Sequence, residues 1–170
     1  LSRRQRQMCI RDRDRVLAIG RNALYFEDYV LSIQYFNQVI KSKPWLAEPY
    51  FYRAVAKINL DDFKGAEEDC TLCLQRNPFL TQAYYARGIA RQSQEKYDEA
   101  IAFFDEAIEM NPSFAKAYSE RGRAKNLKGD KTGAFEDLKK SLELNPESEE
   151  AQKMNGQHSN FDDMYKGGIF

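Results

Sequence analysis

The sequence is poor in the residues on which most enzymes depend. Its 170 residues include one histidine, His158, so neither a Ser-His-Asp nor a Cys-His catalytic arrangement is expected. No GxxxxGK[ST] or GxGxxG motif occurs, so no glycine-rich loop is predicted to hold a phosphate. We therefore expect no enzymatic activity and no cofactor.

Cysteine is also scarce, with three residues in the whole chain. Cys70 and Cys73 form a single CxxC, and without a second pair it cannot complete a four-ligand zinc site. Both cysteines occupy apolar columns of a predicted helix, where free cysteine behaves as a small buried hydrophobic residue. We therefore expect no metal site.

Long apolar runs and net charge are missing too. No run is long enough to span a membrane, so membrane insertion is not expected. The formal net charge is zero, and the chain after residue 13 is mildly acidic, which argues against non-specific nucleic-acid binding. We expect a soluble protein, and its compartment, cytoplasmic or exported, stays open.

The chain does have an internal repeat. Four prolines follow one another at intervals of 34 residues: Pro44, Pro78, Pro112 and Pro146. A unit of this length cannot bury its own apolar face, so it must stack on copies of itself. The period therefore predicts four similar units in a row.

Small and large residues alternate in fixed columns of this repeat. The small column holds Gly20, Ala54, Gly88 and Gly122, and a large column later in each unit holds Phe36, Cys70, Phe104 and Leu138. Spacings of three and four within each run place such residues on one helical face. Polar breaks such as Asp61-Asp62 divide each unit into two helix-length runs. Each unit is therefore predicted to be an antiparallel helix pair.

This organisation resembles the tetratricopeptide repeat family. The third unit matches best, with Tyr84, Gly88, Tyr97, Ala100, Phe104, Ala107 and Pro112 in family columns. The resemblance implies an all-α, right-handed solenoid of four helix pairs with a C-terminal capping helix, and the repeat style is similar to bacterial proteins of the Bacteroidota. The predicted parts are a solenoid over 14–156, with repeats 13–46, 47–80, 81–114 and 115–148 and a cap over 148–155, and an irregular tail over 157–170.

The N-terminal segment 1–13 is treated separately, because LSRRQRQMCIRDR lacks a helical apolar period. It resembles translated sequencing-adaptor sequence, so we expect a disordered or artefactual arm and a missing natural start. An arginine-rich transit peptide and a nucleic-acid-binding arm are the functional alternatives.

Basic residues depart from the family pattern in the first helices. Arg53 with Lys57 and Arg121 with Lys125 stand where the family has apolar side chains. Their stems can cover apolar surface while the charged groups reach solvent. The alternative is pairing with second-helix carboxylates, since Asp69 and Asp137 occupy equivalent columns; Phe103 stands in that column of the third repeat.

Binding is the function that remains, and the stacked first helices are expected to line a groove. Its apolar and aromatic part is followed by a basic and polar part, which suits a peptide with hydrophobic anchors and an acidic group. The expected groove residues are Leu17, Arg21, Leu24, Phe51, Val55, Ile58, Tyr85, Ile89, Gln92, Lys116, Ser119, Arg123 and Asn126. Phe51 and Tyr85 are the expected anchors, because aromatic residues dominate binding hot spots.

The expected partner is a protein or peptide of unknown identity. Family members that bind chaperone C-terminal tails use a basic and asparagine clamp, but the matching positions here hold Leu17, Arg21, Tyr52, Gln82 and Ala86 in one frame, so chaperone tails are poor candidates. A truncated regulatory or recruitment fragment of a larger protein and a homo-oligomeric structural element are the alternative functions. The apolar tail is expected to dock on the last helices, to act as a binding motif, or to be the stump of a further domain.

Overall fold

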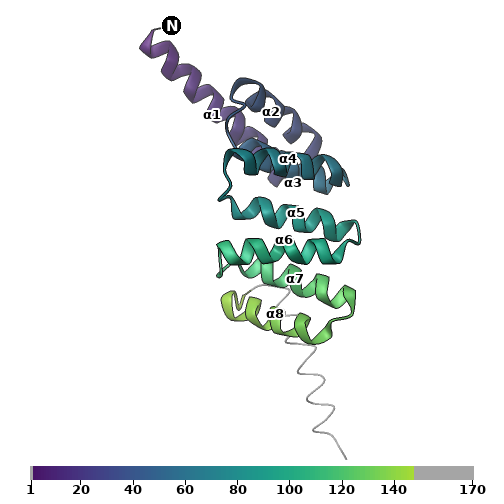
Figure 1. Cartoon of the computed structure of the whole chain (residues 1–170). Coiled ribbons are helices and arrows are strands. Elements are labelled where there is room, and N and C mark those ends of the chain that lie inside the picture. The colour runs from purple at the N-terminus through teal and green to yellow at the C-terminus, as the bar shows by residue number, and fades with distance from the viewer. Residues whose placement is uncertain (1, 148–170) are drawn as a thin grey trace, which may run out of the picture. The chain divides into compact units, whose positions relative to one another are not determined.

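The computed structural model describes residues 2–147, and helix is the regular secondary structure throughout that range (Figure 1). This confirms the all-α class. The helices are α1 (Arg3–Tyr25), α2 (Tyr29–Ser42), α3 (Glu48–Asn59), α4 (Phe63–Arg76), α5 (Thr81–Ser93), α6 (Tyr97–Met110), α7 (Ala115–Lys128) and α8 (Lys131–Leu144). They fall into two compact units, one with α1–α5 and the other, from Tyr97 on, with α6–α8. The predicted cap and tail lie outside the described residues.

Each first helix ends in the same left-handed turn. Among residues 2–147, those with positive φ are Glu27 (62°), Asp61 (60°), Glu95 (60°) and Gly129 (101°), again 34 residues apart. The backbone amide of the residue after each of these donates to the carbonyl oxygen five residues earlier. The Asp62 amide, for example, lies 2.9 Å from the Lys57 carbonyl oxygen, which is the hydrogen bond of a Schellman motif. The polar breaks in the sequence are thus sharp turns that reverse the chain.

The second helices begin and end with side-chain and proline signals. Asp28, Asp62 and Asp130 cap α2, α4 and α8, each accepting a hydrogen bond from the amide three residues later. Asn77 ends α4 with an extended backbone, φ −140° and ψ 90°, as expected for a residue that precedes proline. Proline then prevents the helix from continuing.

Close approach of the paired helices depends on the small column. A Cβ added to Gly20 would lie 2.8 Å from the Phe36 ring, so the missing side chain lets Phe36 pack directly on α1. In the second unit, a Cβ on Gly122 would lie 3.0 Å from both Leu138 Cγ and the Ala134 carbonyl oxygen. The small residues of the first helices therefore receive the large residues of the second helices.

The core of the first unit continues from one pair to the next. One buried cluster joins α3, α4 and α5, and its members are Ala54, Ala66, Cys70 and Ala86. A second cluster joins the same helices through Tyr50, Cys73 and Ala83. Both cysteines are fully buried, which confirms that they act as small core residues.

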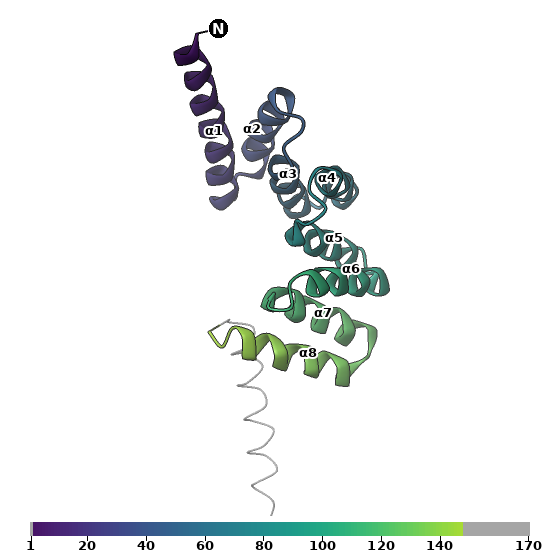
Figure 2. The same ribbon diagram turned by 60° about the vertical axis from the view of Figure 1, so that its left-hand side comes forward.

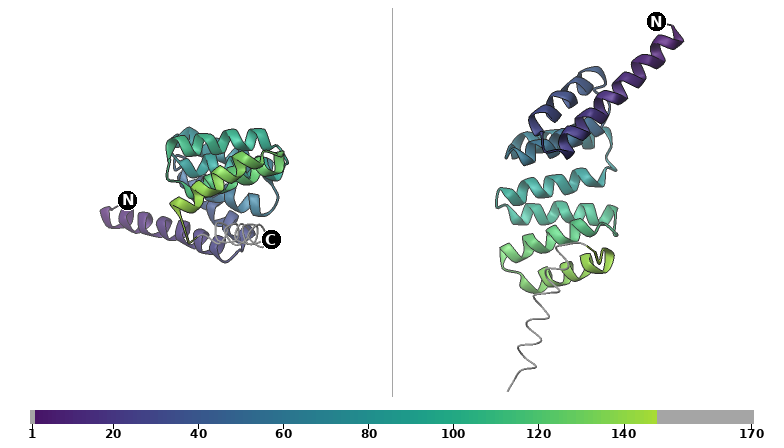
Figure 3. Two further views of the ribbon diagram at one scale, coloured as in Figure 1. Left: turned by 90° about the horizontal axis from the view of Figure 1, so that it is seen from below. Right: turned by 180° about the vertical axis from the view of Figure 1, so that it is seen from behind.

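The residues from Arg3 on are helical, whereas the sequence predicted a disordered or artefactual arm over 1–13. Ser2 Oγ accepts a hydrogen bond from the Gln5 amide at 3.1 Å, and the Ser2 amide donates to Gln5 Oε1 at 2.8 Å. This capping box begins α1, and arginine and glutamine favour helix even without an apolar period. The first part of α1 extends past α2 (Figures 2 and 3). The adaptor resemblance concerns the origin of the segment and stays a prediction.

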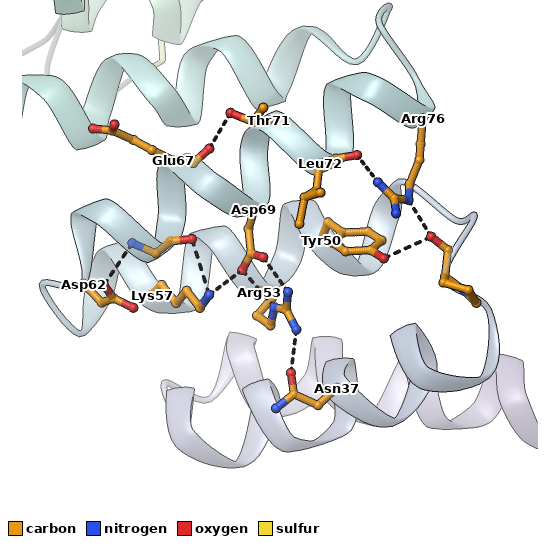
Figure 4. Close-up of polar contacts among 12 residues, drawn as sticks. Asn37, Tyr50, Arg53, Lys57, Asp62, Glu67, Asp69, Thr71, Leu72 and Arg76 are labelled. Atoms are coloured by element: carbon orange, nitrogen blue, oxygen red, sulfur yellow. Dashed lines mark hydrogen bonds and ion pairs between the residues drawn. The ribbon is translucent and has the colours of Figure 1, made fainter.

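A buried aspartate of α4 binds two basic side chains of α3 (Figure 4). Asp69 is 1% exposed, and its carboxylate accepts hydrogen bonds from Arg53 Nε at 2.8 Å and Nη2 at 2.5 Å. Lys57 Nζ lies 2.8 Å from Asp69 Oδ2. Arg53 Nη1 also donates to Asn37 Oδ1 on α2 at 2.7 Å. One guanidinium therefore joins α2, α3 and α4.

The second unit repeats this arrangement around α7. Arg121 donates to Asp137 of α8 from Nε at 2.8 Å and Nη2 at 2.5 Å, and Lys125 Nζ lies 2.8 Å from the same carboxylate. Arg121 Nη1 reaches Asp105 of α6 at 2.6 Å. Although burial acts in the opposite direction, the hydrogen bonds to Asp137 and Asp105 raise the pKa of Arg121. Pairing of these arginines with second-helix carboxylates is thus confirmed.

Removing Arg121 is expected to destabilise the protein through the carboxylate it leaves behind. Arg121→Leu leaves Asp137 buried with Lys125 alone, and breaking such a pair lowers the free energy of unfolding by about 3 kcal/mol. The double variant Arg121→Leu/Asp137→Leu recovers most of this loss. Chemical denaturation measures both changes.

Arg123→Leu serves as the matched control, because Arg123 is exposed and forms one ion pair, with Glu120 at 3.3 Å. Arg123→Leu is expected to change the free energy of unfolding by no more than about 0.5 kcal/mol. Equal stability of the Arg121 variant and the wild type would show that the buried pair is not needed.

The left-handed turns predict opposite effects of two substitutions. Glu27→Gly removes the steric cost of φ 62° and is expected to raise the free energy of unfolding by about 0.5–1 kcal/mol, whereas Gly129→Ala at φ 101° lowers it by about 1 kcal/mol. Thermal or denaturant unfolding of both variants tests this. Destabilisation by Glu27→Gly would contradict the left-handed conformation.

Candidate functional site

Nine of the thirteen predicted groove residues lie on the first helices of the first unit. These helices, α1, α3 and α5, are neighbours, since α1 contacts α3 and α3 contacts α5. The nine residues are Leu17, Arg21 and Leu24 on α1, Phe51, Val55 and Ile58 on α3, and Tyr85, Ile89 and Gln92 on α5. The fold thus gathers these residues on three adjacent helices, though they differ in what covers them.

A hollow of about 410 Å³ lies where the C-terminal half of α1 meets α3, and we call it the α1–α3 hollow. Its lining residues are Ala18, Arg21, Asn22, Leu24, Tyr25 and Tyr52. Arg21 and Leu24 were expected to face a ligand, whereas Ala18, Asn22 and Tyr25 were missed. Tyr52 lies one residue past the expected groove column, and the run of three aromatic residues at 50–52 was the available signal.

Tyr52 is held in place by aromatic packing beneath it. Its ring stacks on Phe36 of α2, with ring centroids 5.8 Å apart and ring planes 22° apart. Phe36 is fully buried and packs where Gly20 lacks a side chain. Phe51 contacts the Tyr52 ring from the neighbouring position, at 5.3 Å between centroids. The wall formed by Tyr52 therefore follows from the packing of the first two helix pairs.

Arg21 is the charged residue of the α1–α3 hollow. Its guanidinium carbon lies 5.2 Å from the centroid of the Tyr52 ring, within the range of a cation–π contact. Within the part of the chain that the structure describes, Arg21 forms no ion pair, whereas Arg53 and Arg121 are each bound by buried aspartates. Its hydrogen-bond donors are therefore available to an incoming anion.

The predicted residues of α3 combine structural and surface roles. Phe51 and Ile58 are half-buried and pack against the cluster that contains Cys70 and Ala86. Phe51 is thus part of the interface between repeats, which weakens its expected role as an anchor. Val55 is half-buried and belongs to neither cluster.

The other predicted residues lie on α7 of the second unit. Lys116, Arg123 and Asn126 are exposed. Ser119 is 8% exposed, which corrects the expectation that it faces a ligand. Its column position was right for an open groove, but the packing around α7 covers the short side chain.

The CxxC of α4 has none of the features of a reactive pair. Burial raises the pKa of the Cys70 thiol to about 12 and that of Cys73 to about 11. The thiolate is the nucleophile and the metal ligand, so both sulfurs stay protonated at neutral pH. Among residues 2–147, no group of three or more His, Cys, Asp or Glu side chains is arranged to hold a metal ion. Nor does any helix of that range have the length and apolar character needed to cross a membrane.

Comparison with known families matches two parts of the chain. Models described as tetratricopeptide repeat match residues 81–114 and residues 115–148. No curated protein matches the chain.

Solved structures with the same fold cover most of the described helices. The TPR domain of OM64 from Arabidopsis is 27% identical, with a TM-score of 0.65, and the alignment covers 68% of this chain and 96% of that domain. TTC0263 from Thermus thermophilus is 20% identical, with a TM-score of 0.72 and coverage of 79% and 75%. YrrB, described as a TPR protein with an unusual peptide-binding site, is 20% identical, with a TM-score of 0.68 and coverage of 81% and 71%.

The raised thiol pKa values predict slow labelling of the folded protein. In a Cys9→Ser background at pH 8, Cys70 and Cys73 are expected to react with a thiol reagent only at the rate of unfolding, because both are buried and protonated. Mixing with the reagent in native buffer and in denaturant gives the two rates. Rapid labelling in native buffer would contradict the buried placement.

Proposed function

Because the chain belongs to the tetratricopeptide repeat family, we propose that it is a non-enzymatic interaction module that binds a peptide segment of a partner protein along the first helices of its repeats. The supporting observation is the incomplete burial of apolar residues on α3 and α5. Val55 and Ile89 keep part of their surface open, although neither has a polar group to place in water. A strip of this kind is typical of a partner site.

Rigidity of this surface favours binding. The first helices are preformed and held by the second helices, so the protein has little conformational entropy to lose when a partner docks. The partner segment supplies hydrophobic side chains, and the helices supply a shaped surface for them. The peptide-binding site ascribed to YrrB belongs to that protein and supports only the class of function proposed here.

Chaperone C-terminal tails are not the proposed ligands. The clamp that binds their terminal carboxylate needs basic and amide side chains, and this chain has Leu17 and Ala86 at two of the matching positions. Tyr52 at a third position is stacked on Phe36 and presents an aromatic wall. The proposed ligand therefore has hydrophobic anchors as its main recognition element.

Two valine variants test the proposal with the same chemical change. Val55→Glu puts a charge on the half-buried surface of α3, and Val30→Glu puts one on α2, where the valine is 59% exposed. Immobilised wild type and both variants, matched for helicity by circular dichroism, are compared for the proteins they capture from lysate of the source cells. A captured partner is expected to bind Val55→Glu at least about tenfold more weakly, because burying an unpaired charge is costly, and to bind Val30→Glu unchanged.

Calorimetric titration of the purified partner supplies the affinities. An equal loss of affinity in Val55→Glu and Val30→Glu, or no loss in either, would place the binding surface elsewhere and contradict the proposal.

A further inference from the structure

We propose that the turns after α1 and α3 form a second protein-binding surface, which takes a basic segment with apolar side chains from a partner. We call this surface the turn patch. It comprises residues 25–28, where the chain turns from α1 to α2, and residues 59–62, where it turns from α3 to α4. The turn patch lies beyond the residues assigned to the groove, so this inference goes beyond the proposed function.

Three apolar side chains of the turn patch are open to solvent. Tyr25 is 81% exposed, Phe26 77% and Leu60 43%. The rings of Tyr25 and Phe26 meet edge to face, with centroids 5.3 Å apart, so they form one surface. Since an aromatic side chain buries about 150–250 Å² when it is covered, a ligand over both rings removes about 300 Å² from water. Exposed apolar patches of this size are often functional.

Charge selects the sign of the ligand. The same two turns contain four exposed carboxylates and no basic residue: Glu27, Asp28, Asp61 and Asp62. Within residues 2–147, none of these carboxylates forms an ion pair. Like charges that lie together without a counter-charge create a negative potential, which attracts a cationic ligand. The corresponding turns of the third and fourth repeats each contain a lysine, so this combination is specific to the first two repeats.

Backbone hydrogen bonds hold the two turns in the same shape. The Asp28 amide lies 2.9 Å from the Ala23 carbonyl oxygen, and Asp62 makes the same bond in the turn from α3 to α4. Both aspartates also accept a hydrogen bond at Oδ1 from the amide three residues later, at 3.2 and 3.0 Å. Because α1 contacts α3, the two turns lie at the same end of adjacent repeats. The turn patch is thus preformed, which lowers the conformational entropy lost on binding.

These observations define the chemistry of the partner. An aromatic or large aliphatic side chain of the ligand covers the rings of Tyr25 and Phe26, and neighbouring lysine or arginine side chains lie near the carboxylates. An acidic segment is repelled by the same carboxylates, and a neutral apolar segment gains only from the rings. The ligand that fits both features is a protein segment in which basic and apolar residues alternate.

Three pentapeptides separate the two requirements. Acetyl-Arg-Trp-Arg-Leu-Arg-amide has both features, acetyl-Glu-Trp-Glu-Leu-Glu-amide reverses the charge, and acetyl-Arg-Ser-Arg-Ser-Arg-amide lacks the apolar side chains. Each is titrated into the ¹⁵N-labelled full chain, and backbone amide shifts are followed by NMR. The first peptide is expected to shift the amides of residues 25–31 and 59–64 and to bind at least about tenfold more tightly than either of the others. Raising the salt concentration from about 20 to about 300 mM is expected to weaken its binding at least about threefold, because the screening length falls.

Two phenylalanine variants locate the apolar contact. Phe26→Ser removes a ring from the turn patch, and Phe79→Ser removes an equally exposed ring, 80% open to solvent, from the turn between α4 and α5. With helicity matched by circular dichroism, Phe26→Ser is expected to bind the first peptide at least about fivefold more weakly, and Phe79→Ser is expected to bind it as the wild type does.

Two double variants locate the charge contact. Glu27→Gln/Asp61→Asn removes two carboxylates from the turn patch and keeps both capping aspartates. Glu106→Gln/Glu109→Gln removes two exposed carboxylates from α6. The first double variant is expected to reduce the preference for the basic over the acidic peptide at least about fivefold, whereas the second leaves that preference intact.

Several results would overturn the proposal. They are equal binding of the basic and acidic peptides, shifts confined to residues outside the turn patch, and equal effects of the variant and its control in either pair. Sedimentation adds a further outcome: self-association that Phe26→Ser abolishes and Phe79→Ser retains would assign the turn patch to a second copy of the chain and overturn it too. Because the peptides need no natural partner, these results are independent of the lysate experiment on the Val55 surface.

Discussion

Close approach of the two helices in each pair is the constraint on which the rest of the structure depends. It is possible because the first helix has a small residue where the second presents a large one, as Gly20 does for Phe36. A side chain at Gly20 would meet the Phe36 ring at 2.8 Å, and Phe36 in turn supports Tyr52. The position of Tyr52, which lines the α1–α3 hollow, therefore depends on the absence of a Cβ at Gly20.

Charge is used in two different ways on the first helices. Arg53 and Arg121 each connect a buried aspartate with a neighbouring second helix, so their charges serve the fold. Arg21 lies on an equivalent helix but forms no such pair among the described residues, and its charge faces a hollow. The same residue type thus connects helices through buried aspartates in two places and has an aromatic ring as its contact in a third.

Several features of the site could be predicted because they depend on spacing alone. The repeat period placed Arg21 and Leu24 on the side of α1 that meets α3, and it placed both cysteines in the core. Features that depend on packing could not be predicted. Ser119 has the right column position for a groove, yet the surroundings of α7 leave 8% of it exposed. Phe51 has the right position too, but it packs against the buried cluster that contains Ala86.

By itself the sequence determined the helix pairs, their turns and their apolar faces. These follow from local chemistry that recurs at intervals of 34 residues: small and large columns, aspartate caps at three of the four second helices, and proline after each second helix. Only the tertiary structure decided that the helix α1 begins at Arg3 and that Arg21, unlike Arg53 and Arg121, forms no ion pair among the described residues. The physical reason is that periodicity assigns a residue to a face of its own helix. Which neighbour covers that face, and which charge finds a partner, depends on contacts between residues far apart in the chain.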